Sequence, residues 1–280
     1  MGGEGAQQER NDAHDALKHL TKSRHDAAMT RAREDPSFRC TSFDLEEVLT
    51  TPHGESVLFF YARKLTVYNF TLYETGNRRG FCHVWDETHG KRGRAEIATI
   101  LHDYVKAVDD ANEGVKTLEL FCDNCPGQNK NKTVIVSLYF ALQSCQNLEN
   151  ITLNFLLKGH TYLPCDSMHA AVEARIRHHL VYAPKVNVEI DYNNQEKSIR
   201  IQAGRGRGRY PGDTSPAIEP KQLYSKRLPI SAEKYRDLIK LCDDENIPEP
   251  FQAEYRSLPH SARQEDILPE GDIDDPEEEE

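Results

Sequence analysis

Acidic side chains and one histidine occur in this chain at positions where they could bind a metal ion. Asp123 directly follows the apolar run Leu118–Cys122, which predicts a strand that ends in a carboxylate. Asp166, His169 and Glu173 are three and four residues apart, so a helix from Asp166 onward would place them on one face. Clustered carboxylates repel one another, and Mg²⁺, which prefers hard oxygen ligands, relieves that repulsion.

A further acid, Asp44, lies on the polar side of the run C-T-S-F-D-L-E-E-V-L, which predicts an earlier strand. An open α/β sheet brings such acids together at the carboxyl ends of its strands. Paired metal ions can then align an attacking water and the leaving oxygen of a phosphodiester. We interpret Asp44, Asp123 and Asp166 as candidate ligands of Mg²⁺ or Mn²⁺, and His160 or His169 as neighbours of the leaving group.

Amide side chains surround Asp123, and a glutamate opens the preceding helix. Asn124, Gln128 and Asn129 either orient metal-bound water and phosphate or close the loop by hydrogen bonds. Glu96 falls in the first turn of a predicted helix, where it either stabilises the positive end of the helix dipole or belongs to the site. Both interpretations remain open for each residue.

Cysteine spacing allows zinc as a minor alternative metal. Cys122 and Cys125 have the two-residue separation of a zinc knuckle, and His160, Cys165 and His169 follow in the chain. The spacing of the downstream groups is irregular, however, so the carboxylate interpretation is preferred.

Apolar periodicity predicts the elements that must position these groups. A polar helix over 11–33 follows a disordered start at 1–10 and ends before Pro36. Alternating and β-branched runs predict strands near 40–49, 57–73 (one long strand or a bent one), 81–85, 118–122 and 151–157. Helical spacing predicts helices over 95–108, 133–144 (with a strand left open), 166–177, 231–242 (capped by Ser231) and 251–258.

Composition and charge bound the class of protein. The 280-residue chain is 38% hydrophobic with net charge −11, and residues 264–280 contain ten acids and no Lys or Arg. The acidity therefore belongs mainly to a tail that is too charged to fold alone. Without a run of 18 apolar residues or a secretory signal, and with seven irregularly spaced cysteines, we expect an intracellular, nuclear protein with reduced thiols and no membrane partner.

A basic segment precedes the C-terminal region. Residues 174–209 contain eight Lys or Arg against three acids and finish in G-R-G-R-G-R-Y. Such Gly-Arg repeats contact phosphates and stack on bases, so Arg205, Arg207 and Arg209 are candidate contacts for RNA or single-stranded DNA. A flexible solvated linker is the competing interpretation.

Several stretches carry a resemblance to a known family. They are S-F-D-L-E-E-V-L-T-T-P at 42–52, F-Y-A-R-K-L-T-V-Y-N-F at 60–70, V-W-D-E-T at 84–88, R-G at 92–93 with Glu96, D-N-C-P-G-Q-N-K-N at 123–131 and F-L-L-K-G-H-T-Y-L-P-C-D-S-M-H at 155–169. Over residues 10–260 the chain resembles an uncharacterised, transposon-associated domain family of animals, whose element order is similar to that of the DDE transposases and integrases.

The resemblance implies an α/β ribonuclease H-like fold with a mixed β-β-β-α-β-α-β-α sheet. By position it matches Asp44 to the first acid of that superfamily, Asp123 to the second, Asp166 or Glu173 to the third, and Glu96 loosely to the first-helix glutamate of ribonuclease H. The expected regions are an N-terminal extension (1–37), the ribonuclease H-like domain (38–182), a basic linker (183–228), a small helical region (229–260) and an acidic tail (261–280). The implied function is a transposase-derived nuclease or strand transferase; the alternative is an inactive module that binds nucleic acid or protein.

Overall fold

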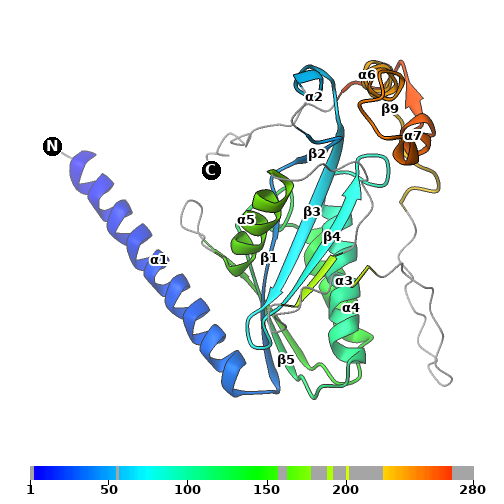
Figure 1. Cartoon of the computed structure of the whole chain (residues 1–280). Coiled ribbons are helices and arrows are strands. Elements are labelled where there is room, and N and C mark those ends of the chain that lie inside the picture. Colours follow the sequence, from blue (N-terminus) through cyan, green and yellow to red (C-terminus); the bar gives the residue numbers. More distant parts are fainter. Residues whose placement is uncertain are drawn as a thin grey trace.

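The computed structural model describes residues 3–54, 57–156, 163–177, 188–191, 200–201 and 223–266 (Figure 1). Its elements in the first half are α1 (Gly3–Glu34), β1 (Phe38–Leu45), β2 (Leu49–Thr51), α2 (Val57–Tyr61), β3 (Leu65–Glu74), β4 (Arg79–Asp86), α3 (Arg94–Asp110) and β5 (Thr117–Cys122). Then come α4 (Lys132–Gln143), β6 (Asn150–Phe155), α5 (Pro164–Arg177), β7 (Val188–Asp191), β8 (Arg200–Ile201), β9 (Ile230–Ser231), α6 (Ala232–Asp243), α7 (Glu249–Arg256) and β10 (His260–Ser261).

The molecule is built on a mixed eight-stranded sheet with the order β6-β5-β1-β3-β4-β7-β8, and β2 pairs with β3 beside this path. Strands β1, β5 and β6 are parallel, whereas β3 is antiparallel to both β1 and β4. Because β1 and β5 run in the same direction, residues that follow them emerge at the same edge of the sheet.

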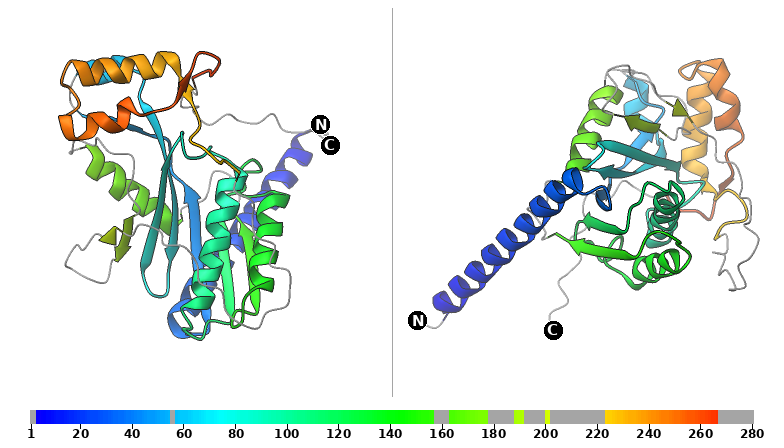
Figure 2. Two further views of the ribbon diagram at one scale, coloured as in Figure 1. Left: turned by 90° about the vertical axis from the view of Figure 1, so that its right-hand side faces the viewer. Right: turned by 90° about the horizontal axis from the view of Figure 1, so that it is seen from below.

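Helices cover both faces of the sheet, with α3 and α4 on one face and α1 and α5 on the other (Figure 2). Successive side chains of β1 point to opposite faces of the sheet, so the strand contacts helices on both sides. Phe43 and Leu45 belong to the main apolar cluster with Leu101 and Leu138 of the helices α3 and α4. The intervening positions of β1 face α1 and α5 instead, and Asp44 is one of them.

Local sequence explains where the main helices begin. The Asn131 side chain accepts a hydrogen bond from the Val134 N–H at 3.1 Å and so caps α4. The Ser231 hydroxyl caps α6 in the same way, through the Lys234 N–H at 3.1 Å, as predicted. Helix formation over 133–143 also decides the open choice between helix and strand there. Across the described residues, no helix combines the length and the apolar character needed to cross a membrane.

The C-terminal helices form a second apolar cluster beyond the end of β4. Leu238 of α6 and Tyr255 of α7 pack in it together with Phe59 of α2 and Leu65 of β3. The sheet and this C-terminal unit are joined by an ion pair between Lys234 Nζ and Glu87 Oε1 at 2.7 Å. Two regions far apart in sequence therefore share one interior.

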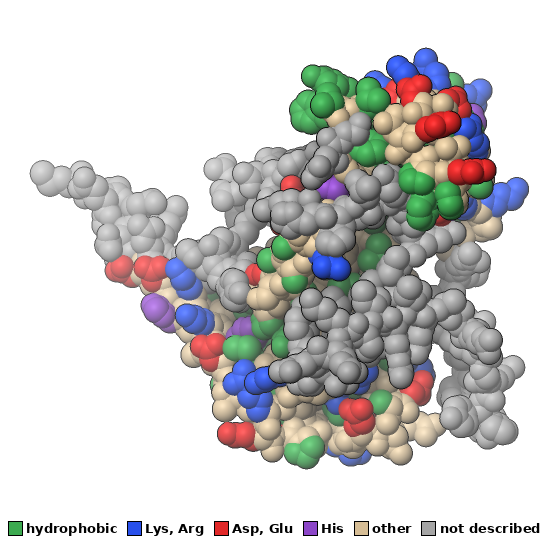
Figure 3. All heavy atoms as spheres, in the orientation of Figure 1, with side chains coloured by type: hydrophobic (Ala, Val, Ile, Leu, Met, Phe, Trp, Pro, Cys, Tyr) green, Lys and Arg blue, Asp and Glu red, His purple; other side chains and the backbone are tan. Residues whose placement is uncertain are grey.

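The predicted strand over 57–73 is wrong in its first part, because Val57–Tyr61 is the helix α2. One helical turn directs Phe59 into the C-terminal cluster, whereas Phe60 and Tyr61 are 81% and 79% exposed. Hydrophobic side chains gather on the surface over α2 (Figure 3). Tertiary contact with Phe59 outweighed the β propensity of these residues.

Two other segments contain secondary structure that the sequence did not predict. Residues 3–10, expected to be disordered, are the first turns of α1, which continues an uninterrupted helical run from Gly3. The segment 183–228, expected to be a linker, contributes β7, which pairs with β4, and β8, which pairs with β7. A strand at the open edge of β4 satisfies backbone groups that would otherwise face water.

Candidate metal centre

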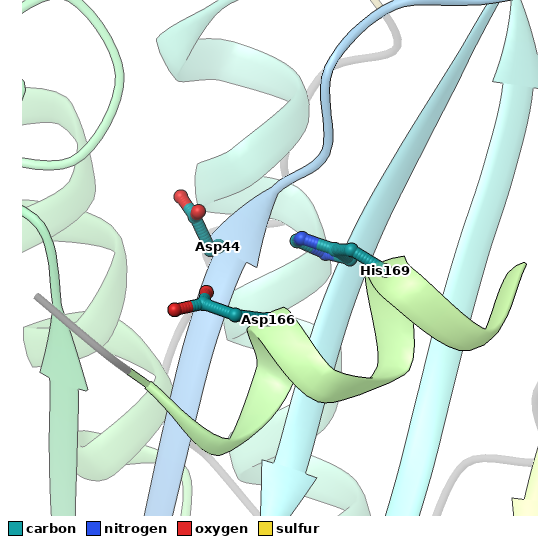
Figure 4. A group of neighbouring side chains, drawn as sticks. All are labelled: Asp44, Asp166 and His169. Carbon is teal, nitrogen blue, oxygen red and sulfur yellow. The ribbon is translucent and has the colours of Figure 1, made fainter. Parts of the chain in front are cut away.

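Asp44, Asp166 and His169 meet where α5 crosses the end of β1 (Figure 4). One ligand atom from each side chain, a carboxylate oxygen or an imidazole nitrogen, lies within 4.8 Å of the other two. Figure 4 shows all three side chains pointing into the same space between strand and helix. No other group of three or more His, Cys, Asp or Glu side chains approaches this closely within the described part of the chain.

The start of α5 fixes the position of Asp166. Pro164 occupies the first helical position, where its missing N–H costs nothing. The Asp166 carboxylate reaches back to accept a hydrogen bond from the Leu163 N–H at 2.8 Å. His169 follows three residues later on the same face, with only 9% of its surface exposed. Asp44 in turn accepts from the Leu45 N–H at 2.8 Å, which fixes its carboxylate at the strand end.

Asp123 immediately follows the neighbouring strand β5 and, unlike Asp44, is not one of the three side chains that lie within 4.8 Å of one another. Ser42 and Phe121 are paired across the parallel strands β1 and β5, and the two acids follow two residues later in each chain segment. Asp123 accepts hydrogen bonds from the Asn129 side-chain amide and, at 3.4 Å, from the Cys125 N–H. The Asp123 charge contributes to the pKa shift of Asp44, which places three carboxylates in one electrostatic neighbourhood.

Burial and like charge make this neighbourhood unfavourable for anions. Burial, then the charges of Asp123 and Asp166, raise the pKa of Asp44 to about 7, although Arg92 acts in the opposite direction. Burial also raises the pKa of Asp166. The same desolvation lowers the pKa of His169 to about 4, so its imidazole is neutral at pH 7 and has a lone pair that can bind a metal ion.

The loop after β5 contains two amide oxygen atoms, close to Asp123 in sequence, that have no hydrogen-bond partner among the described residues. Asn129 is fully buried, and its Oδ1 atom has no hydrogen-bond partner among the described residues; the same is true of Asn124 Oδ1. Gln128 is half-buried and donates its backbone N–H to the Cys125 carbonyl at 3.4 Å. Buried acceptors without donors are uncommon in folded proteins, and ordered water or a bound ion satisfies them.

Comparison with known proteins adds a family match over part of the chain. Residues 72–202 match a family described as "Domain of unknown function (DUF7869)". No curated protein and no solved structure matches the chain. The matched segment contains Asp123, Asp166 and His169, whereas Asp44 precedes it. The candidate centre is therefore completed by a strand outside the matched segment.

Glu96 and Glu173 lie elsewhere than the three clustered side chains. The Glu96 carboxylate accepts a hydrogen bond from the Lys91 N–H at 2.8 Å and organises the turn before α3. A Cβ atom at Gly90 would lie 3.1 Å from Glu96 Cγ, so a larger residue there would press on the glutamate side chain. Glu173 is exposed one turn beyond His169, and its charge acts on Glu46 rather than on Asp44.

Four predicted site residues, His160, Arg205, Arg207 and Arg209, lie outside the described residues. The state of Cys122 does not favour the zinc alternative. Burial, followed by the nearby charge of Asp123, raises the pKa of the Cys122 thiol, whose Sγ donates to the Asn154 carbonyl at 3.8 Å. Zinc binding would require the thiolate.

Sequence reasoning did not single out three polar residues that the fold brings near the end of β1: Glu46, Asn69 and Arg92. Glu46 is two residues after Asp44, and alternation along an extended chain would have placed both on one face. Asn69 carried no signal, because only the pairing of β1 with β3 brings it next to Glu46. Arg92 follows a turn, and only the fold brings its guanidinium close enough to lower the pKa of Asp44.

Proposed function

We propose that the protein is a divalent-cation-dependent enzyme that acts on phosphodiester bonds, with a transposase-derived, ribonuclease H-like catalytic domain. The observation that carries the proposal is the convergence of Asp44, Asp166 and His169 within 4.8 Å at the end of β1. Asp123, which follows the adjacent strand β5, supplies a further carboxylate. A nuclear location belongs to the same proposal.

The order of the strands supports the fold part of the proposal. Three antiparallel neighbours, β4-β3-β1, are followed on the other side of β1 by the parallel strands β5 and β6. Helices α3, α4 and α5 follow β4, β5 and β6 in the chain. This is the β-β-β-α-β-α-β-α order that the resemblance to DDE transposases and integrases implies, with β2 and α2 inserted between the first two long strands.

The donor set fits a divalent cation. Carboxylate oxygens suit Mg²⁺ and Mn²⁺, and an imidazole suits transition metals such as Mn²⁺ better than Mg²⁺. Burial and the neighbouring acids raise the pKa of Asp44, and a bound cation would compete with the proton and favour the charged form of this carboxylate. Asp44, Asp123 and Asp166 would hold the cation, which would supply Lewis-acid activation of the phosphodiester and of water.

The protein's own groups would orient the reaction. Neutral His169 can accept a hydrogen bond from an attacking hydroxyl or water near Asp166 and so orient it, although its pKa of about 4 makes it a weak base. Buried Asn129 and half-buried Asn124 each have an Oδ1 atom without a hydrogen-bond partner among the described residues, which can accept a hydrogen bond from ordered water. Arg92 adds positive charge beside the acids, which favours approach of a phosphate.

Nuclease assays with a matched control test the proposal. The full-length protein should cleave single- or double-stranded DNA or RNA in Mn²⁺ or Mg²⁺ and lose activity in EDTA. Asp44→Asn and Asp166→Asn should each reduce cleavage at least a hundredfold. The control Asp110→Asn changes an exposed acid at the far end of α3 and should cleave like the wild type. Absence of cation-dependent cleavage on all four substrates would refute the enzymatic proposal.

The alternative is a binding module without catalysis, favoured by the Gly-Arg repeat that ends at Arg209. Binding would then be dominated by phosphate contacts, so affinity for single-stranded nucleic acid should fall steeply between 50 and 200 mM salt, on the order of tenfold or more. Binding that persists in Asp44→Asn, without cleavage by the wild type, would favour this alternative.

A further inference from the structure

Strand β6 forms an open edge of the sheet. It is the terminal strand in the order β6-β5-β1-β3-β4-β7-β8, and within the described part of the chain it pairs only with β5. Proteins usually protect such an edge with Lys, Pro, a bulge or a covering segment, because its unpaired N–H and C=O groups attract another strand. The six residues Asn150–Phe155 include no charged residue and no Pro, so β6 lacks this side-chain protection.

The backbone groups at this edge belong to three alternate residues. Asn150, at the start of β6, donates its N–H to the Lys116 carbonyl at 3.1 Å, so the even-numbered residues of the strand bond to β5. Alternate residues of a parallel strand face opposite neighbours. The N–H and C=O groups of Ile151, Leu153 and Phe155 therefore point away from the sheet.

This pattern is complementary to itself. When two copies of β6 lie antiparallel about a two-fold axis, Leu153 lies opposite Leu153 of the second copy, and Ile151 lies opposite Phe155 of the second copy. Residues that face each other in this way exchange both of their N–H···O bonds. All three side chains are apolar and pack on the main cluster beneath α3 and α4, so the cross-strand pairs are apolar as well.

Helix α4 adds an exposed apolar face. Ile135, Val136, Tyr139 and Phe140 are between 39% and 58% exposed, although all four are large hydrophobic side chains. No residue over 133–143 carries a charge. A helix on the surface of a protein normally has polar and charged residues on its outer face. The outer face of α4 is therefore typical of a helix that is covered by another apolar surface.

Part of this face lies on the side of α4 that points away from α3. The Ser137 hydroxyl donates to the Ala98 carbonyl of α3 at 2.9 Å, which fixes the side of α4 that faces α3. At about 100° per residue, Ile135 and Tyr139 lie on the opposite side of the helix. Helix α4 also contacts β6. The open strand edge and the apolar face therefore form one continuous surface.

We propose that this surface, formed by β6 and the exposed face of α4, is a symmetric dimer interface with a second copy of the chain. A two-fold axis perpendicular to the sheet at Leu153 pairs the two β6 strands and places the two α4 helices side by side on the same face. An uncharged helix meets its own copy without like-charge repulsion, and burial of its apolar side chains stabilises the contact. The interface does not depend on the phosphodiester chemistry proposed above.

Analytical ultracentrifugation of the full-length protein over a range of concentrations tests the proposal. The wild type should sediment as a dimer. Tyr139→Lys introduces a charge at an exposed position of the interface, so the variant should fold normally and dimerise at least tenfold more weakly. The control Phe60→Lys introduces the same charge at an exposed apolar position of α2, outside the interface, and should dimerise like the wild type.

Hydrogen exchange of individual amides locates the contact. The N–H groups of Ile151, Leu153 and Phe155 should exchange at least tenfold more slowly in the dimer than in the dissociated α4 variant, whereas those of Thr152 and Asn154, which face β5, should be protected in both. A wild type that is monomeric at every concentration would overturn the proposal and favour a strand from a different protein as the partner of β6. A dimer that persists in the α4 variant, or that leaves the three outward-facing amides unprotected, would also overturn it.

Discussion

The ionised Asp44 carboxylate destabilises the folded protein, because it is buried beside other acids at the candidate metal centre. Burial, then Asp123 and Asp166, raise its pKa from 3.8 to about 7. The folded chain therefore holds the proton more tightly than the unfolded chain. The protonated Asp44 carboxyl therefore stabilises the folded state fully below about pH 4, and this contribution is lost as the pH rises through 7. Groups that destabilise the fold in this way are concentrated at functional sites.

Replacement of Asp44 by Asn should therefore stabilise the metal-free protein. The amide keeps an oxygen for the Leu45 N–H and carries no charge at any pH. In EDTA, we expect Asp44→Asn to exceed the wild type in free energy of unfolding by about 1–3 kcal/mol at pH 8 and to differ little at pH 4.5. Urea unfolding at both pH values measures this difference. A variant less stable than wild type at pH 8 would show that Asp44 has a structural role instead.

At the scale of elements, Asp109 joins the end of α3 to the segment between α4 and β6. Its carboxylate accepts hydrogen bonds from the N–H groups of Gln146, Asn147 and Leu148 at 2.8, 2.7 and 2.8 Å. Burial would raise the pKa of Asp109, but these three donors hold it below its ordinary value. The contact fixes how β6 enters the sheet, and β6 leads to α5 and its two site residues.

Asp109→Asn should destabilise the protein, because an amide nitrogen would face backbone N–H donors. We expect a loss of about 2–4 kcal/mol in the free energy of unfolding, since buried donors lose a charged acceptor. The adjacent control Asp110→Asn alters an exposed acid and should stay within about 0.5 kcal/mol of wild type. Urea denaturation of the three proteins measures both values. Equal stabilities for the two variants would contradict the proposed role of the contact.

For the whole molecule, the C-terminal helices depend on the buried Lys234 ammonium, which pairs with Glu87 and, also at 2.7 Å, with Asp266. The side chains of Lys234 and Glu87 are 3% and 7% exposed, and Glu87 Oε1 also accepts from the Thr66 N–H at 2.8 Å. A pair of this kind adds little net stability, but removal of one partner leaves the other charge buried and alone. The pair therefore specifies how α6 docks on β3 and β4.

Lys234→Met should reduce the free energy of unfolding by about 3–5 kcal/mol, because Glu87 loses its counter-charge. Adding Glu87→Gln to that variant should recover part of the loss, since the remaining partner of Lys234, Asp266, is 19% exposed and also pairs with Arg63. Lys240→Met, at an exposed position of the same helix, serves as the control and should behave like wild type. Thermal unfolding of the four proteins gives the comparison; a double variant less stable than Lys234→Met would argue against the charge explanation.

The sequence alone determined the elements whose signals are local. Helix α3 follows from apolar spacing, α6 from apolar spacing and its capping residue Ser231, and β5 and β6 from short apolar runs, whereas α4 was left open between helix and strand. It also placed Asp166 and His169 on one helical face, because spacing within a helix is a local property. Residue type then marked Asp44 and Asp123 as acids at strand ends.

Only the tertiary structure decided which of these acids meet. Asp44 and Asp166 converge because α5 crosses the end of β1, whereas Glu96 organises a turn and the Glu173 charge acts on Glu46 instead. Likewise, Val57–Tyr61 became a helix because Phe59 packs against residues nearly two hundred positions later. Pairing and packing between distant segments depend on the free energy of the whole fold, which no local window of sequence contains.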